Sequence, residues 1–152
     1  MATPTTTATN AANTTAEPTL VAPQVERLDA PELADLLSAD RDAVVVVDVR
    51  DAGTEGGFIR GALSVPKTQF DSDDFVDKFV QEHAGDQLLV FHCLNSNTRG
   101  PTAAGRVYDR IAEALKSADK KPNVKVLKGG FKVFSERYGD DEKLVDPSAL
   151  PQ

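Results

Sequence analysis

Three short runs of aliphatic residues constrain the fold more than any other feature of this sequence. They span residues 44–47, 88–91 and 124–127, and polar residues or glycine soon follow each run. Apolar runs of this length, interrupted here only by Lys125, are typical of strands buried on both faces, as in a parallel sheet. The sequence therefore predicts a mainly parallel central sheet that is covered on both sides.

Apolar residues in the intervening segments recur at the spacing of helices, and they predict four helices that flank the sheet. Asp29 can cap the first helix, with Pro31 in its first turn. The residues expected to face inward are Leu33, Leu36 and Leu37; Phe75, Val76, Phe79 and Val80; Ala104, Val107, Ile111 and Leu115; and Phe131, Phe134 and Tyr138. Strands that alternate with helices predict an α/β domain, whose ligands lie beyond the carboxyl ends of the strands.

The chain of 152 residues has the length of one domain. Residues 1–22 are rich in Thr and Ala with almost nothing to bury, and they predict a disordered tail. Its threonines leave a phosphorylated regulatory tail as the alternative. The folded domain is expected over 23–140, and the acidic residues 141–152 are expected to form a C-terminal tail over the surface.

The net charge of -7 argues against binding to nucleic acid or to an anionic membrane, because phosphates repel an acidic surface. No apolar run approaches the roughly 20 residues of a membrane-spanning helix. One cysteine and two histidines exclude an internal disulfide and a zinc site of four Cys/His ligands. An unpaired cysteine favours the cytoplasm, with the nucleus as a second compartment.

Cys93 lies close behind the second aliphatic run, where an α/β domain binds its ligands. Five residues separate it from Arg99, which precedes the third predicted helix. Loop amides and a helix N-terminus bind anions, and the planar fork of an arginine matches the oxygens of a phosphate-like group. We therefore expect Cys93 and Arg99 to be catalytic. The expected substrate-binding residues are Leu94, Asn95, Ser96, Asn97, Thr98 and Arg99.

Several groups must act together if Cys93 is to react as a thiolate. A helix N-terminus contributes only ~0.3–1 kcal/mol to a nearby anion. Each hydrogen bond to a charged group contributes about 1.5–3 kcal/mol. The helix, the loop amides and Arg99 together are sufficient to stabilise Cys93 as a thiolate, whereas the helix alone is not. The alternative for Cys93 is a buried structural thiol, the usual state of a lone cysteine.

The segment from His92 and Cys93 to Arg99 resembles the signature of cysteine-dependent phosphatases. Three further segments resemble the rhodanese fold: VDVRD, GGFIRGALSVP and VLKGGF, where Phe58 stands at the usual position of a histidine. Together they cover roughly residues 25–140. The chain is thus similar to small single-domain relatives of cell-division-cycle dual-specificity phosphatases and to eukaryotic arsenate reductases.

This resemblance implies a role for Cys93 as the nucleophile that forms a phospho-cysteine intermediate, or a thiol adduct with arsenate. Arg99 and the amides of residues 94–99 would hold the oxyanion and its transition-state charge. Ser96 would hydrogen-bond the thiolate and help it leave.

Two residues outside the loop are implied to support it from below. Asp48 would orient the loop, and its alternative is a helix or turn cap. His92 would steady the junction of strand and loop, and its alternative is a core imidazole with satisfied hydrogen bonds.

The phosphatase interpretation ranks first and arsenate reduction second. Leu94 and Thr98 stand where the cell-cycle phosphatases have acidic residues, and a general acid contributes about 10²–10⁴ to the rate. The nearest acidic cluster in sequence, Asp71, Asp73 and Asp74, is better explained as the start of a helix. Arsenate reduction needs no such acid. It needs an external thiol, for which glutathione or glutaredoxin is expected.

Two minor alternatives remain, a sulfurtransferase with a shorter loop ending at Thr98 and a phosphate-binding module without turnover. No bound cofactor and no metal are expected, because Arg99 and the amides supply the positive field. The expected partners are a phosphorylated protein or a small oxyanion, with glutaredoxin for the reductase.

Overall fold

The sheet at the centre of the molecule is parallel throughout. The computed structural model describes residues 20–150. The strands are, in spatial order, β3 (Glu26–Leu28), β8 (Asn123–Leu127), β7 (Leu88–His92), β4 (Val44–Asp48) and β6 (Leu63–Ser64). The three central strands are the predicted aliphatic runs, each one residue longer, and the α/β fold is confirmed. The short edge strands were not predicted, because two or three residues carry no detectable pattern.

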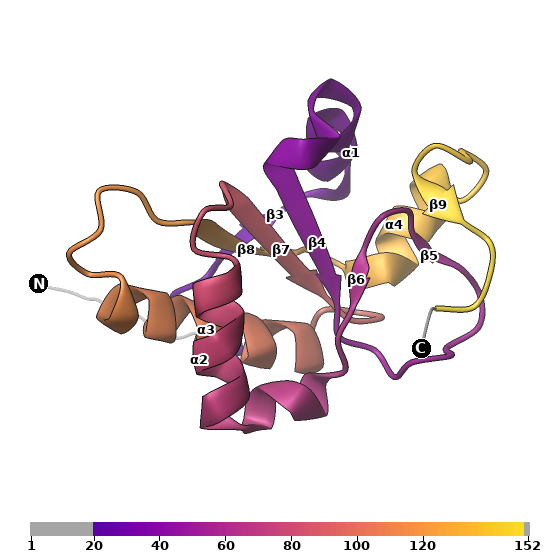
Figure 1. Ribbon diagram of the computed structural model, residues 1–152. Coiled ribbons are helices and arrows are strands. Elements are labelled where there is room, and N and C mark those ends of the chain that lie inside the picture. Colours follow the sequence, from indigo (N-terminus) through magenta and orange to yellow (C-terminus); the bar gives the residue numbers. More distant parts are fainter. Residues whose placement is uncertain (1–19, 151–152) are drawn as a thin grey trace, which may run out of the picture.

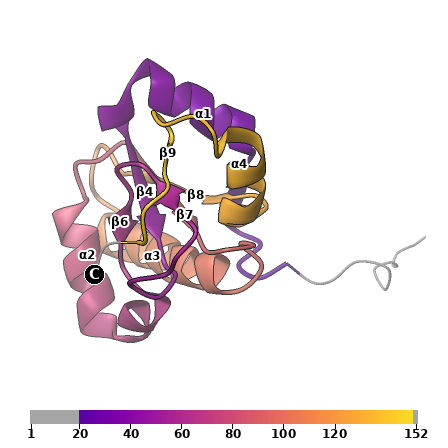
Figure 2. The ribbon, with the colours of Figure 1, turned by 90° about the vertical axis from the view of Figure 1, so that its right-hand side faces the viewer.

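Helices cover both faces of the sheet (Figures 1 and 2). α1 (Ala30–Ala39) and α4 (Gly130–Tyr138) pack on one face. α2 (Asp73–Glu82) and α3 (Arg99–Ala114) pack on the other. The short 3-10 helices η1 (Arg41–Ala43) and η2 (Lys67–Asp71) precede β4 and α2. Among these described residues, no helix is long and apolar enough to cross a membrane.

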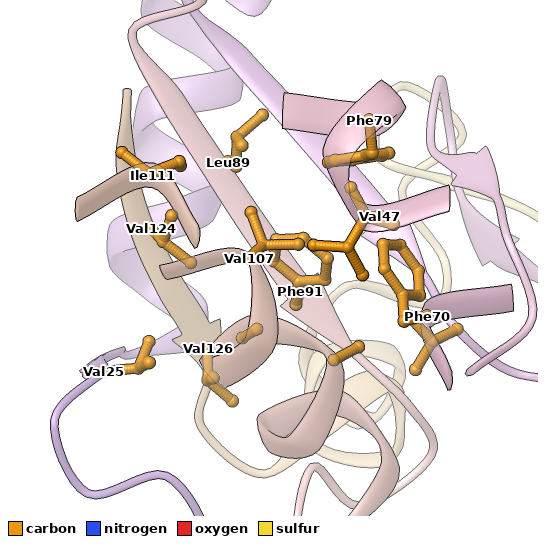
Figure 3. Packing of buried hydrophobic residues seen from close by; sticks show 14 of the residues in the cluster. Val25, Val47, Phe70, Phe79, Leu89, Phe91, Val107, Ile111, Val124 and Val126 are labelled. Carbon is orange, nitrogen blue, oxygen red and sulfur yellow. The ribbon is translucent and has the colours of Figure 1, made fainter. Parts of the chain in front are cut away.

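The core under α2 and α3 is built on the central strands (Figure 3). Phe91 of β7 is fully buried, and the ring of Phe70 meets the rings of Phe79 and Phe91 edge-on at 5.2 and 5.7 Å. Leu36 was predicted to face inward but is 39% exposed. The buried stripe of α1 runs through Ala30, Leu33, Ala34 and Leu37 at helical spacing, which leaves Leu36 outside it.

The C-terminal segment is part of the domain rather than the predicted surface tail. Residues 141–150, here called the C-terminal strap, contain β9 (Val145–Asp146), which pairs antiparallel with β5 (Phe58–Ile59). Leu144, Val145 and Leu150 are buried. Leu144 and Val145 form a run of only two apolar residues after a charged stretch, and Leu150 lies five residues further on, so the composition hides a segment that packs.

The N-terminal boundary lies close to the predicted one. Residues 1–19 of the predicted tail lie outside the described residues. Ala22 already packs against the core, and the Arg27 guanidinium donates hydrogen bonds to the carbonyls of Val21, Ala22 and Val25. The domain therefore begins before Pro23.

Candidate active site

Cys93 directly follows β7, and helix α3 begins at Arg99, so residues 94–98 form a loop at the carboxyl edge of the sheet. The Cys93 side chain is buried, and its Sγ accepts a hydrogen bond from the amide of Gly100, with 3.3 Å between N and S. The donor belongs to the first turn of α3, where the helix dipole also favours negative charge. The Cys93 sulfur therefore lies against the N-terminal turn of α3.

Gly100 allows this close approach. A Cβ on this residue would lie 3.1 Å from the Cys93 nitrogen and from two backbone atoms of His92. A larger residue would push α3 away from the end of β7 and lengthen the contact with Sγ. Sequence reasoning missed this role, and its only signal was a glycine in the first turn of a helix, where glycine disfavours the helix.

The first turn of α4 forms hydrogen bonds to the start of the loop. The amide of Phe131 donates to the carbonyl of Cys93 at 3.0 Å, and the amide of Lys132 donates to that of Leu94 at 2.9 Å. Both carbonyls therefore point towards α4. Since each peptide group is planar and trans, the N–H groups of Leu94 and Asn95 point to the opposite side. Two amides are thus turned away from α4 and stay free of its hydrogen bonds.

Gly130 makes the contact between α4 and the loop possible. Its φ is +64°, and a Cβ there would lie 2.4 Å from the Leu94 carbonyl oxygen. The glycine pair after β8 was recognised only as part of a family pattern. In the structure, the absence of a side chain at Gly130 lets the backbone of α4 approach the carbonyl of Leu94 closely.

The loop itself presents mostly polar side chains to solvent. Ser96 has a φ of +56° and is buried, and its Oγ has no hydrogen-bond partner among the described residues. Arg99 is exposed at the first residue of α3, so its guanidinium is open to an oxyanion from solution. The other predicted binding side chains, Leu94, Asn95, Asn97 and Thr98, are also exposed.

Asp48 and His92 lie side by side beneath the loop, because they are paired residues of neighbouring strands. Both are fully buried. The Asp48 carboxylate accepts two hydrogen bonds from the Arg50 guanidinium, from Nε at 3.0 Å and from Nη2 at 2.7 Å. It also accepts the backbone amide of Arg50 at 3.0 Å, so the turn-cap alternative is partly correct. The Nε2 atom of His92 lies 3.7 Å from an Asp48 oxygen.

The charges of this buried group follow from its surroundings. Burial raises the pKa of Asp48, but the His92 ring and the hydrogen bonds and charge of Arg50 lower it, and the pKa ends below its usual value. Burial holds the pKa of His92 below its usual value, against the attraction of Asp48. At neutral pH we therefore infer an ionised Asp48 and a neutral His92.

The neutral imidazole of His92 carries a single N–H group. Its Nδ1 atom lies 3.0 Å from the carbonyl oxygen of Cys93, which can only accept, so the proton is on Nδ1. Nε2 is then an acceptor, and it has no hydrogen-bond partner among the described residues. His92 is therefore only half satisfied as a core imidazole, and its N–H holds the backbone of the nucleophile.

The acidic cluster lies at the end of η2 and the start of α2, and its contacts are those of a helix terminus and of surface ion pairs. Ser72 caps α2 by accepting the amide of Phe75 at 3.3 Å. Asp73 pairs with Arg106 of α3 at 2.5 Å, and Asp71 pairs with Lys67 at 2.7 Å. These contacts favour the helix-start interpretation of the cluster. Asp48, buried and ionised, is not placed to donate a proton either.

Proteins with two kinds of activity are similar to this chain. The dual specificity phosphatase ibp1 of Schizosaccharomyces pombe is 32% identical over 117 residues, which cover 68% of this chain and 83% of the relative. Arsenate reductase 2.2 of Oryza sativa is 34% identical over 110 residues, which cover 70% of this chain and 79% of the relative.

Solved structures give the same picture. Saccharomyces cerevisiae Ygr203w, described as a homolog of single-domain rhodanese and the Cdc25 phosphatase catalytic domain, aligns with a TM-score of 0.70 at 26% identity. The alignment covers 84% of this chain and 90% of that one. The As-Sb reductase of Leishmania major aligns with a TM-score of 0.59 at 27% identity, over 77% and 81% of the two chains.

The family follows from the matched span. The model of the rhodanese-like domain matches residues 29–137, which run from the cap of α1 to the last turn of α4. This span contains the central strands, the loop and both helices that hold it. The chain therefore belongs to the rhodanese-like domain family.

Proposed function

We propose that this chain is a cysteine-dependent phosphatase of the tyrosine or dual-specificity type. The observation that carries the proposal is the loop from Cys93 to Arg99, which runs from the end of β7 into α3, with the thiol 3.3 Å from the Gly100 amide. The loop amides that point away from α4 and the exposed Arg99 supply donors for a phosphate-sized anion. The similarity to named phosphatases supports the same activity.

The proposed reaction has two displacement steps. The Cys93 thiolate attacks phosphorus in line, an S–P bond forms, and the bond from phosphorus to the ester oxygen breaks. Water then attacks phosphorus, the S–P bond breaks, and phosphate leaves with regeneration of the thiolate. Arg99 and the loop amides stabilise the charge of both transition states. Ser96, whose hydroxyl is buried in the loop, stabilises the thiolate as it leaves.

The charge state of the site favours aryl phosphates as substrates. The loop contains no carboxyl group, and Asp48 is held as an anion by Arg50. A phenolate leaves without protonation more readily than an alkoxide does. We therefore expect faster hydrolysis of phosphotyrosine than of phosphoserine.

Arsenate reduction is the second candidate, and the lack of a loop acid favours it. Arsenate would form an adduct with Cys93, and attack by glutathione would release arsenite and leave a mixed disulfide on Cys93. The two thiols supply the two electrons that As(V) takes up. Glutaredoxin would then reduce the mixed disulfide. The 34% identity to a plant arsenate reductase supports this candidate.

Two assays with the purified chain separate the candidates. One measures hydrolysis of p-nitrophenyl phosphate and of matched phosphotyrosine and phosphoserine peptides. The other measures arsenate-dependent NADPH consumption through glutathione, glutaredoxin and glutathione reductase. Cys93→Ser is the blank in both. Turnover in the second assay alone would make arsenate reduction the function. Phosphate binding without turnover in either assay would indicate a binding module.

Arg99 has a matched control in Arg137, an exposed arginine in the last turn of α4. Removal of one donor to a transition-state oxyanion costs about 10²–10³ in kcat. We expect a loss of that size in Arg99→Ala and none in Arg137→Ala. Equal activity of the two variants would contradict the proposed site.

A further inference from the structure

Arg50 lies in a buried position beneath the nucleophile, where it cannot meet a substrate. It is 3% exposed, and besides Asp48 it binds the carbonyl of Gly57 through Nη2 at 3.0 Å. Its guanidinium carbon lies 4.5 Å from the centre of the Phe131 ring. One side chain therefore touches three segments: the end of β4, the segment before β5 and the first turn of α4.

The carbonyl of Cys93 accepts hydrogen bonds from two donors, the Nδ1–H of His92 and the backbone amide of Phe131, each at 3.0 Å. Each donor residue contacts one member of the buried ion pair. Asp48 lies 3.7 Å from the His92 ring nitrogen, and Arg50 lies over the Phe131 ring. The His92 and Phe131 rings are stacked with 6.3 Å between their centres. Arg50 therefore contacts the Phe131 ring directly, and its hydrogen bonds fix the Asp48 carboxylate, which packs beside the His92 ring without a hydrogen bond to it.

The carbonyl of Cys93 determines where the next amide points. The peptide group between Cys93 and Leu94 is planar, so a rotation of its C=O rotates the Leu94 N–H by the same angle. That N–H lies on the side of the loop away from α4. Any shift of His92 or Phe131 therefore moves a donor that the proposed function assigns to oxyanion binding.

We propose that Arg50 is a positioning residue, which orients the Cys93–Leu94 peptide for oxyanion binding through Asp48, His92 and Phe131. The inference rests on the proposed function for its effect on turnover, but its effect on anion binding is independent of turnover. The competing explanation is that the ion pair only stabilises the fold. Replacement of a buried ion pair by apolar residues is often neutral for stability, so stability and positioning can be separated.

The test compares Arg50→Met with the double variant Asp48→Leu/Arg50→Met. The single variant leaves a buried carboxylate unpaired, and we expect its Tm to fall by about 10–20 °C. The double variant removes both charges and should recover most of this loss. We expect it still to lose about 100-fold in kcat/KM on p-nitrophenyl phosphate, the cost of a displacement near 1 Å.

A second readout does not need turnover. Inorganic phosphate bound at the loop should protect Cys93 from alkylation by iodoacetamide. In the double variant, the phosphate concentration that gives half protection should rise at least tenfold. Wild-type protection and wild-type kcat/KM in a double variant with recovered Tm would overturn the inference.

Arg50→Lys covers the case in which the double variant does not fold. A lysine keeps the charge opposite Asp48 but lacks the planar fork that reaches Asp48, Gly57 and Phe131 together. We expect a small loss of Tm and a clear rise in the phosphate concentration for half protection. Unchanged protection in this variant would equally overturn the inference.

Arg60→Met is the matched control. Arg60 is exposed, and its guanidinium binds Glu142 and Asp146 of the C-terminal strap without contacting the residues that hold Cys93. Its replacement should lower Tm slightly and leave protection unchanged. Protection without turnover in the wild type would reject the proposed function and keep the inference testable. No protection in the wild type would reject both.

Discussion

Two regions of this molecule each contain an ion pair between an aspartate and an arginine, one buried and one exposed. Beneath the loop, Asp48 and Arg50 form a buried ion pair, with exposures of 0% and 3%. Between α2 and α3, Asp73 and Arg106 form an ion pair with exposures of 90% and 38%. Water screens the second pair, whereas the first has only its own contacts to offset the loss of hydration. The exposed pair therefore adds only a little to the packing of α2 on α3. The buried pair is expected to determine how the residues around it are arranged.

The largest expected effect breaks the buried pair. Asp48→Ala leaves the Arg50 guanidinium buried without its carboxylate, and we expect the free energy of unfolding to fall by about 3–5 kcal/mol. Urea denaturation of the wild type and the variant measures this change. A loss below 1 kcal/mol would show that the buried region tolerates an unpaired charge as well as the surface does.

The second-largest effect is expected from a change in the backbone that contacts the loop. Gly130→Ala places a β-carbon at a φ of +64° and against the Leu94 carbonyl. The left-handed conformation alone costs about 1–2 kcal/mol, and the clash should also displace the loop and lower turnover. Gly85→Ala is the control, because no atom of residues 20–150 lies within 4 Å of its Cβ position. Equal stability and activity of both variants would contradict the close packing under the loop.

A pH titration compares a buried histidine with a more exposed one. Burial lowers the pKa of His92, so the folded state takes up a proton less readily than the unfolded state, whose histidine titrates near about 6.5. The stability from this group is present above that pH and is lost as pH falls towards the folded pKa. Its contribution to the slope approaches about 1.4 kcal/mol per pH unit.

Urea denaturation at several pH values measures how stability declines below pH 6.5. In the variant His92→Gln, this decline should be less steep than in the wild type. His83→Gln serves as the control, since His83 is partly exposed and pairs with Asp86 at 2.7 Å. A decline as steep in His92→Gln as in the wild type would assign the pH dependence to other groups.

The smallest effect belongs to the surface pair. Asp73→Ala removes the partner of Arg106, and we expect a loss of about 0.2–1 kcal/mol that shrinks at high salt. Thermal or urea denaturation at low and high salt measures both features. A loss near that of Asp48→Ala would remove the contrast between the two regions.

The sequence was informative wherever a structure repeats along the chain. The aliphatic runs that became β4, β7 and β8 and the stripes of the four helices were readable, because each is a local pattern. Leu36 was misassigned, since a stripe of mixed alanine and leucine left two possible faces for α1. The C-terminal strap was missed because its longest buried apolar run has only two residues, and its partner strand lies more than 80 residues away in the chain.

The loop from Cys93 to Arg99 is local, and so its residues, their order and their place between a strand and a helix were determined by the sequence alone. The groups that hold it are not local. Arg50 follows β4 and Phe131 belongs to α4, so both lie far from the loop in sequence, and the contacts of Phe131 with Cys93 and of Arg50 with Phe131 exist only when the strands have paired. Gly100 follows the loop directly, but its approach to Cys93 also needs the packing of α3 on the sheet. Spacing in the sequence reveals which side chains carry chemistry. Only tertiary packing decides which buried neighbours orient them, because those contacts depend on distances that the order of residues does not encode.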